Sequence, residues 1–78
     1  MVTAEQVQAA VDVLVGNADY SAQQAAYAVV TEVVARAERG ATLGSEWRRA
    51  LMKLYAVQGT WGNAPIGFPA RLRAIVEQ

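Results

Sequence analysis

The chain contains no cysteine and no histidine among its 78 residues. Without cysteine, no disulfide can constrain the fold and no thiolate can bind zinc. Without histidine, the chain lacks the side chain that most often transfers protons near neutral pH, and it has neither Ser-His-Asp nor Cys-His catalysis available. We therefore expect a fold stabilised by packing or by a partner subunit, with no metal and no cofactor.

Catalytic motifs are scarce among the residues that remain. Glu5 and Asp12 share one face of a predicted helix, but they lie about 10 Å apart along it, too far to share a proton. The stretch at 59–67, GTWGNAPIG, matches neither the phosphate-binding loop nor the dinucleotide-binding fingerprint. These observations predict a protein that is not an enzyme.

Long apolar runs and a leader sequence are also lacking. No run approaches the roughly 20 apolar residues of a membrane span, and the first five residues have no basic or apolar region of a signal peptide. We therefore expect a cytoplasmic protein that does not contact a membrane. The excess of alanine, valine and arginine is typical of a GC-rich genome, such as that of an actinobacterium or one of its phages.

Hydrophobic residues make up 54% of the chain, and their spacing predicts one all-α domain of four helices over residues 1–78. Thr3 and Gln6 have the spacing of a capping box, which would start the first helix, and Gly16 would end it. Ser21 and Gln24 have the same spacing and predict the start of a second helix.

This second helix, at residues 22–39 and ended by Gly40, is the longest and most apolar that the sequence predicts. Its valine pairs, at 29–30 and 33–34, have a spacing of four that favours a helix over a strand. Its apolar arc covers half the circumference or more, whereas a single contact needs only about 100°. We therefore expect this helix at the centre of the domain.

Two shorter helices follow. Ser45, or alternatively Thr42, would cap a third helix that runs to about residue 58. Pro69 suits the first position of a fourth helix because its fixed φ is already helical. At about nine residues, this last helix is too short to be stable alone, so it must pack against the others.

The segment between these two helices, residues 59–68, is rich in glycine and proline yet carries Trp61, Ile66 and Phe68. One interpretation is a plug that folds back and holds the fourth helix, because burying one aromatic ring removes about 150–250 Å² from water. The alternative is an exposed apolar patch for a partner. We favour the plug, although the two interpretations are compatible in part.

The wide apolar arc of the second helix predicts self-association. The edge formed by Tyr27 and Val34 has no evident partner within the chain, so we expect it to pack across the two-fold axis of a homodimer. The function predicted is a small non-enzymatic protein–protein interaction module, which binds itself or another protein and would act on a host protein if the chain is of phage origin. The predicted partner-binding residues are Tyr27, Val34, Trp61 and Phe68.

Charge is distributed unevenly, although seven basic residues balance seven acidic ones. Residues 1–40 contain two basic and five acidic residues, and residues 41–78 contain five and two. The halves could complement each other within the fold, orient a protein partner, or present a basic face to nucleic acid. The nucleic-acid alternative is disfavoured by the zero net charge. It would use Arg48, Arg49, Lys53, Arg71 and Arg73.

Overall fold

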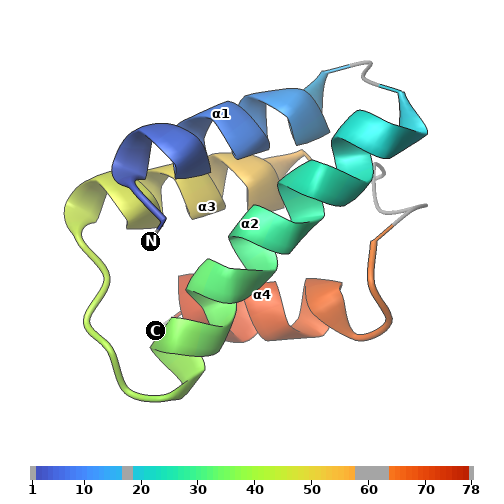
Figure 1. Ribbon diagram of the computed structural model, residues 1–78. Helices are drawn as coiled ribbons and strands as arrows, with labels where there is room; N and C mark the ends of the chain where they lie inside the picture. Colours follow the sequence, from blue (N-terminus) through green and yellow to red (C-terminus); the bar gives the residue numbers. More distant parts are fainter. Residues whose placement is uncertain (1, 17–18, 58–63, 78) are drawn as a thin grey trace.

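The computed structural model describes residues 2–16, 19–57 and 64–77. Within these residues the chain forms four helices and no strand, which confirms the predicted all-α class (Figure 1). The helices are α1 (Ala4–Val15), α2 (Tyr20–Glu38), α3 (Ser45–Ala56) and α4 (Phe68–Val76).

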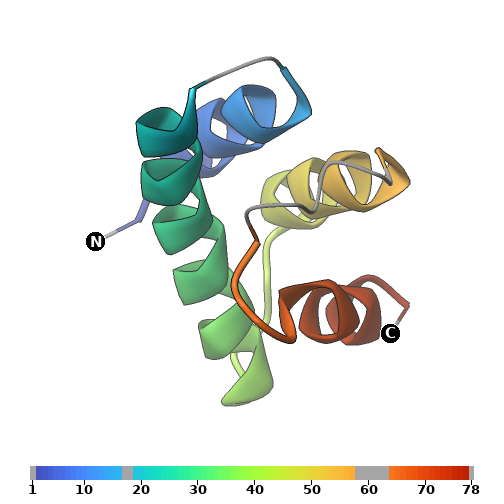
Figure 2. The same ribbon diagram turned by 90° about the vertical axis from the view of Figure 1, so that its right-hand side faces the viewer.

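The four helices pack in a ring around one core. α1 packs against α2 and α3, and α4 packs against the same two helices from the other end. α2 crosses in front of the others in Figure 1, and the side view in Figure 2 places α3 and α4 on the same side of it. α2 also supplies the largest group of buried residues of any helix.

The start of α1 is the predicted capping box. The backbone N–H of Gln6 donates to the Thr3 hydroxyl at 3.2 Å, and the Thr3 N–H donates to the Gln6 side chain at 2.8 Å. These two bonds satisfy N–H groups that have no partner within the helix. Gly16 is the C-cap, as predicted.

The predicted start of α2 is wrong by two residues. Asp19, not Ser21, is the N-cap, and its carboxylate accepts a hydrogen bond from the Ala22 N–H at 2.8 Å. Aspartate caps a helix as well as serine does, so the earlier residue starts it and Ser21 lies within the first turn. At the other end, Gly40 has a φ of 95°, a left-handed conformation that ends the helix after Glu38.

Glycines rather than polar side chains precede the last two helices. Gly44 is the N-cap of α3, so neither Ser45 nor Thr42 has the capping role that we expected. α4 begins one residue before Pro69, at Phe68, and follows Gly67 with a φ of 81°. Glycine adopts this left-handed turn without steric cost, and the turn directs Phe68 at the core.

The core is entirely apolar among the described residues. Its largest fully buried side chains come from all four helices and include Val7, Val30, Leu51, Phe68 and Leu72. Because α4 contributes Phe68, Leu72 and Ile75, its short length is compensated by docking on α2 and α3.

Candidate protein-docking surface

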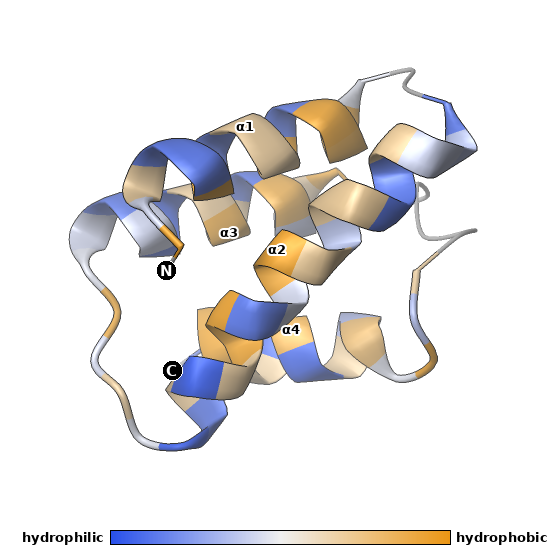
Figure 3. Ribbon diagram, viewed as in Figure 1, coloured by the Kyte–Doolittle hydropathy of each residue, from blue (hydrophilic) through white to orange (hydrophobic). Residues whose placement is uncertain are grey.

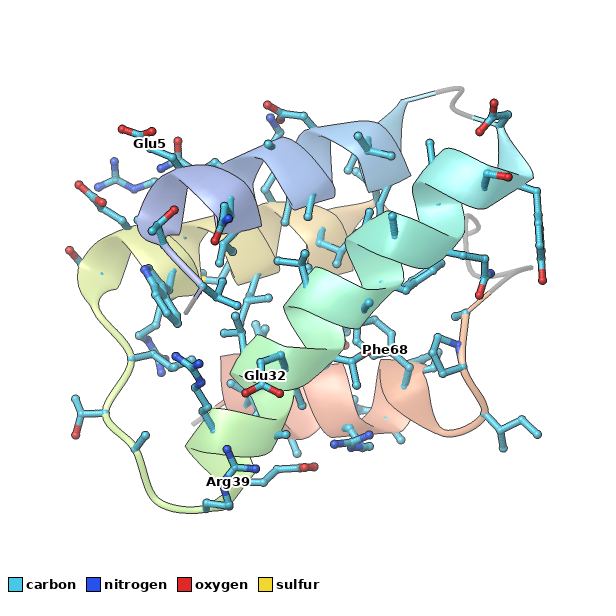
Figure 4. The ribbon with its side chains drawn as sticks, in the orientation of Figure 1. Glu5, Glu32, Arg39 and Phe68 are labelled. Carbon is cyan, nitrogen blue, oxygen red and sulfur yellow. The ribbon has the colours of Figure 1, made fainter. Side chains whose placement is uncertain are left out.

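One edge of α2 is covered by α4. Tyr27 is 2% exposed and Val34 is fully buried, so the prediction that this edge lacks a partner within the chain is wrong. The residue that covers it is Phe68, whose ring meets the Tyr27 ring edge-on at a centroid distance of 5.4 Å. Figure 4 shows Phe68 between α2 and α4. Tyr27, Val34 and Phe68 are therefore core residues and are not available to a protein partner.

The large apolar residues of segment 59–68 divide between its two interpretations. Phe68 is fully buried, as the plug interpretation predicts. Ile66 is fully exposed and is not part of the plug, because it lies in the turn that brings Phe68 inward. Trp61, the remaining predicted partner-binding residue, lies outside the described residues.

The opposite edge of α2 borders an open apolar groove of about 530 Å³ against α1, which we call the α1–α2 groove. The α1 side is formed by Val2, Gln6, Ala9, Ala10 and Val13. The α2 side is formed by Ala22, Ala25, Ala26 and Val29. Apart from Gln6, every residue that lines the groove is apolar. Figure 3 shows apolar residues on the face of α2 that is turned toward the viewer.

The spacing of these residues explains how a groove forms beside a closed core. Ala22, Ala25 and Val29 follow one another at intervals of three and four, which place them along one stripe of α2. Gln6, Ala9 and Val13 have the same spacing on α1. Val29 and Val13 are half-buried, whereas Ala9 and Ala25 are exposed. Two apolar stripes therefore lie side by side beyond the core, with no described element of the chain over them.

The charges near the groove are paired or lie at its margins. Beyond Val29, the stripe on α2 continues with Glu32 and Arg36, which form an ion pair at 3.2 Å. Figure 4 shows Glu32 on the face of α2 away from Phe68. No charged side chain lines the groove itself. A partner can therefore cover it without burying an unpaired charge.

The two oppositely charged halves of the chain are joined by ion pairs. Lys53 on α3 contacts Asp12 on α1 at 3.0 Å. Arg71 on α4 donates two hydrogen bonds to the Glu38 carboxylate at the end of α2, at 2.6 and 2.9 Å. This arrangement supports the interpretation that the halves complement each other within the fold.

The same contacts correct the predicted basic face. Of its five cations, Lys53 and Arg71 point toward different helices, and Arg73 pairs with Glu77 at 3.2 Å. Arg48 also has an interaction partner. Arg49 lines a hollow of about 280 Å³ between α1 and α3, together with Asp12 and Glu46. Acidic residues thus accompany Lys53, Arg71 and Arg73 directly and line the same hollow as Arg49, so these four cations do not form one continuous basic surface.

Two environments shift the pKa values of ionisable groups. The hydrogen bonds from Arg71 hold the pKa of Glu38 below its usual value, and Glu38 in turn raises the pKa of Arg71. Burial raises the pKa of the Tyr27 hydroxyl. The first effect belongs to the junction of α2 and α4 and the second to the core. Neither group lies in the α1–α2 groove.

Other kinds of site are not evident in the part of the chain that the structure describes. It contains no group of three or more acidic side chains placed to hold a metal ion. None of its helices has the length and apolar character needed to cross a membrane. Comparison of the chain with protein-family models, with curated proteins and with solved structures finds no match.

The sequence pattern contains the groove residues, but the edge of α2 predicted to stay open is the wrong one. The apolar arc of α2 is indeed wider than the core requires, and Ala22, Ala25 and Val29 belong to it. These positions have the interval of three and four that indicates a helix stripe. Bulky Tyr27 and Val34 have the larger apolar surface and so favour an interface in the sequence pattern, but that pattern does not show that Phe68 packs against Tyr27.

Proposed function

We propose that the chain is a protein–protein interaction module whose docking surface is the α1–α2 groove. The observation that carries this proposal is an apolar, uncharged groove bounded by two helices and left open by the fold. Apolar grooves between helices are a common binding site for an amphipathic helix of another chain.

The chemistry of the groove supports docking of a protein surface. Ala9, Ala22 and Ala25 have short side chains, so a partner backbone can approach α1 and α2 closely. Val2, Val13 and Val29 add half-buried area that a partner would remove from water, at roughly 25 cal/mol per Å². Gln6 gives one polar contact at the margin.

Site-specific photocrosslinking tests the proposal. The chain has no cysteine, so Ala25→Cys can carry a photoactivatable crosslinker in the groove. Ala74→Cys carries the same group on α4 and is the matched control, because Ala74 is also an exposed helical alanine. We expect protein adducts from position 25, either with a second copy or with another protein, and few from position 74.

The adducts are then identified by mass spectrometry. Equal yields from positions 25 and 74, or no adducts from position 25, would show that the groove is not a docking surface. Circular dichroism of both variants, compared with the unmodified chain, establishes that the labelled proteins keep their helices.

A further inference from the structure

We infer that α4 is a releasable cover on the core. It detaches from α2 and α3 as a unit while α1, α2 and α3 stay folded, and it thereby uncovers the edge of α2 that carries Tyr27 and Val34. The inference concerns the edge opposite the α1–α2 groove and does not depend on docking in that groove. It is carried by a buried hydroxyl without a hydrogen-bond partner on the face of α2 that α4 covers.

That hydroxyl belongs to Thr31. Thr31 is four residues after Tyr27 and seven before Glu38, and these intervals place the three residues on one stripe of α2. α4 contacts both ends of the stripe. The Phe68 and Tyr27 ring centroids are 5.4 Å apart, and Arg71 donates hydrogen bonds to Glu38 at 2.6 and 2.9 Å. Thr31 lies between these two contacts and is therefore on the face of α2 turned toward α4.

The Thr31 hydroxyl oxygen is buried and forms no hydrogen bond with any described residue. A threonine inside a helix can donate its hydroxyl proton to the carbonyl four residues earlier, but the Tyr27 carbonyl does not accept such a bond here. A hydroxyl that loses water without gaining a partner opposes its own burial. Because the hydroxyl regains water when α4 leaves, this group favours the released state over the covered one.

The remaining contacts of α4 are also reversible. The helix has nine residues, and its N-cap, Gly67, supplies no side-chain hydrogen bond. The Arg71 and Glu38 side chains are 37% and 40% exposed, so solvent screens their attraction. α4 is therefore held mainly by the burial of its three core side chains on α2 and α3.

The other three helices keep contacts of their own when α4 leaves. α1 packs against both α2 and α3, and it buries Val7, Val11 and Leu14. It also has twelve residues and begins with the Thr3–Gln6 capping box. Release of α4 is thus a local opening, of the kind through which one part of a fold exchanges its amide hydrogens before the whole chain unfolds.

Native-state hydrogen exchange of the full chain, followed by NMR at increasing sub-denaturing urea, tests the release. The slope of the opening free energy against urea concentration measures the surface that the opening exposes. For the amides of residues 72–76 we expect a smaller slope than for the slowest amides of α1. Without urea, we expect their protection factors to be at least about tenfold lower.

Two results of this experiment would overturn the inference. The same slope and protection in both helices would show that α4 opens only when the whole chain unfolds. Exchange of residues 72–76 that does not depend on urea would show that single residues fray and that the helix does not leave as a unit.

Thr31→Val tests the role of the hydroxyl, because valine has nearly the same shape and no polar atom. We expect it to raise the protection factors of residues 72–76 by about fivefold or more. Thr42→Val makes the same change at an exposed loop residue and should leave these protection factors unchanged. If Thr31→Val also leaves them unchanged, the buried hydroxyl does not favour release and the inference fails.

Thr3→Ala distinguishes release of α4 from unfolding of the whole chain. It removes the side-chain cap of α1, a helix that stays folded in the released state. We therefore expect the protection factors of the slowest α1 amides to fall by about fivefold, whereas those of residues 72–76 stay unchanged. An equal fall in both helices would overturn the inference.

Discussion

The two edges of α2 are both apolar, yet one is buried in the core and the other lies at an open groove. On one edge, Tyr27 and Val34 are buried in the core, where the Phe68 ring of α4 packs against Tyr27. On the other, Ala25 is exposed and Val29 is half-buried at the α1–α2 groove. The comparison shows that an apolar edge becomes core when a distant element supplies a ring to cover it, and stays on the surface when no described element lies over it.

The strongest test of this difference is Phe68→Ala. Loss of a fully buried phenylalanine ring leaves a cavity over Tyr27, and the expected cost is about 3–5 kcal/mol in the free energy of unfolding. Urea unfolding followed by circular dichroism measures it. A dilute protein sample keeps association from contributing.

Ile66→Ala is the control for this substitution, since Ile66 is two residues away and fully exposed. It should change the free energy of unfolding by less than about 0.5 kcal/mol. Similar losses for the two variants would contradict the assignment of Phe68, rather than Ile66, as the residue that fixes α4.

A matched pair of valines compares the two edges directly. Val34→Ala removes fully buried methyl groups and should cost about 2 kcal/mol in the free energy of unfolding. Val29→Ala makes the same change at the half-buried groove edge and should cost less than about 1 kcal/mol in dilute protein. The same urea experiment measures both.

The order of the two substitutions should be reversed when docking in the α1–α2 groove is measured. Val29→Ala should lower the yield of crosslinked adducts from position 25, whereas Val34→Ala should leave that yield unchanged. The opposite result would show that the open edge of α2 is the one that carries Val34.

The smallest effect is expected from the ion pair at the end of the covered edge. The pKa of Glu38 is lower in the folded chain than its ordinary value of 4.5, chiefly because Arg71 donates hydrogen bonds to it. A lowered pKa stabilises the fold above about pH 4.5, and this contribution disappears as the pH falls through the folded-state pKa. Glu38→Gln should therefore make the acid side of the stability–pH curve shallower.

Arg71→Gln provides the second measurement, because it removes the cause of the shift and keeps the carboxylate. Urea unfolding at intervals from about pH 5 to pH 3 should show the same shallower curve for both variants. A curve for Arg71→Gln that is as steep as that of the unsubstituted chain would show that Glu38 is stabilised by something else.

Local features of the fold were predictable from the sequence, but the pairing of distant surfaces was not. The Thr3–Gln6 capping box, the glycine stops and the four helices depend on neighbouring residues, so the sequence pattern was sufficient. α2 starts two residues earlier than predicted, because Asp19 rather than Ser21 caps it. α4 starts one residue earlier than predicted, because Gly67 is its N-cap.

The sequence predicted that α2 has surplus apolar surface, but not which edge of the helix stays open. The surplus of apolar surface on α2 followed from the width of its arc, since helix geometry alone fixes that width. Which edge stays open depends on where Phe68 packs, and Phe68 is distant in the sequence from Tyr27. In the same way, charge counts revealed two complementary halves, but only three-dimensional structure pairs Lys53 with Asp12 and Arg71 with Glu38.

The order of the helices, with α4 after α1, α2 and α3, also has a consequence during synthesis. Because a ribosome releases the chain from its N-terminus, α1, α2 and α3 emerge before Phe68. Until α4 arrives, the edge with Tyr27 and Val34 lacks the cover that α4 gives it, so a nascent chain that has formed α2 exposes this apolar edge as well as the groove edge. The packing of α4 therefore removes one apolar surface through which incomplete chains can associate.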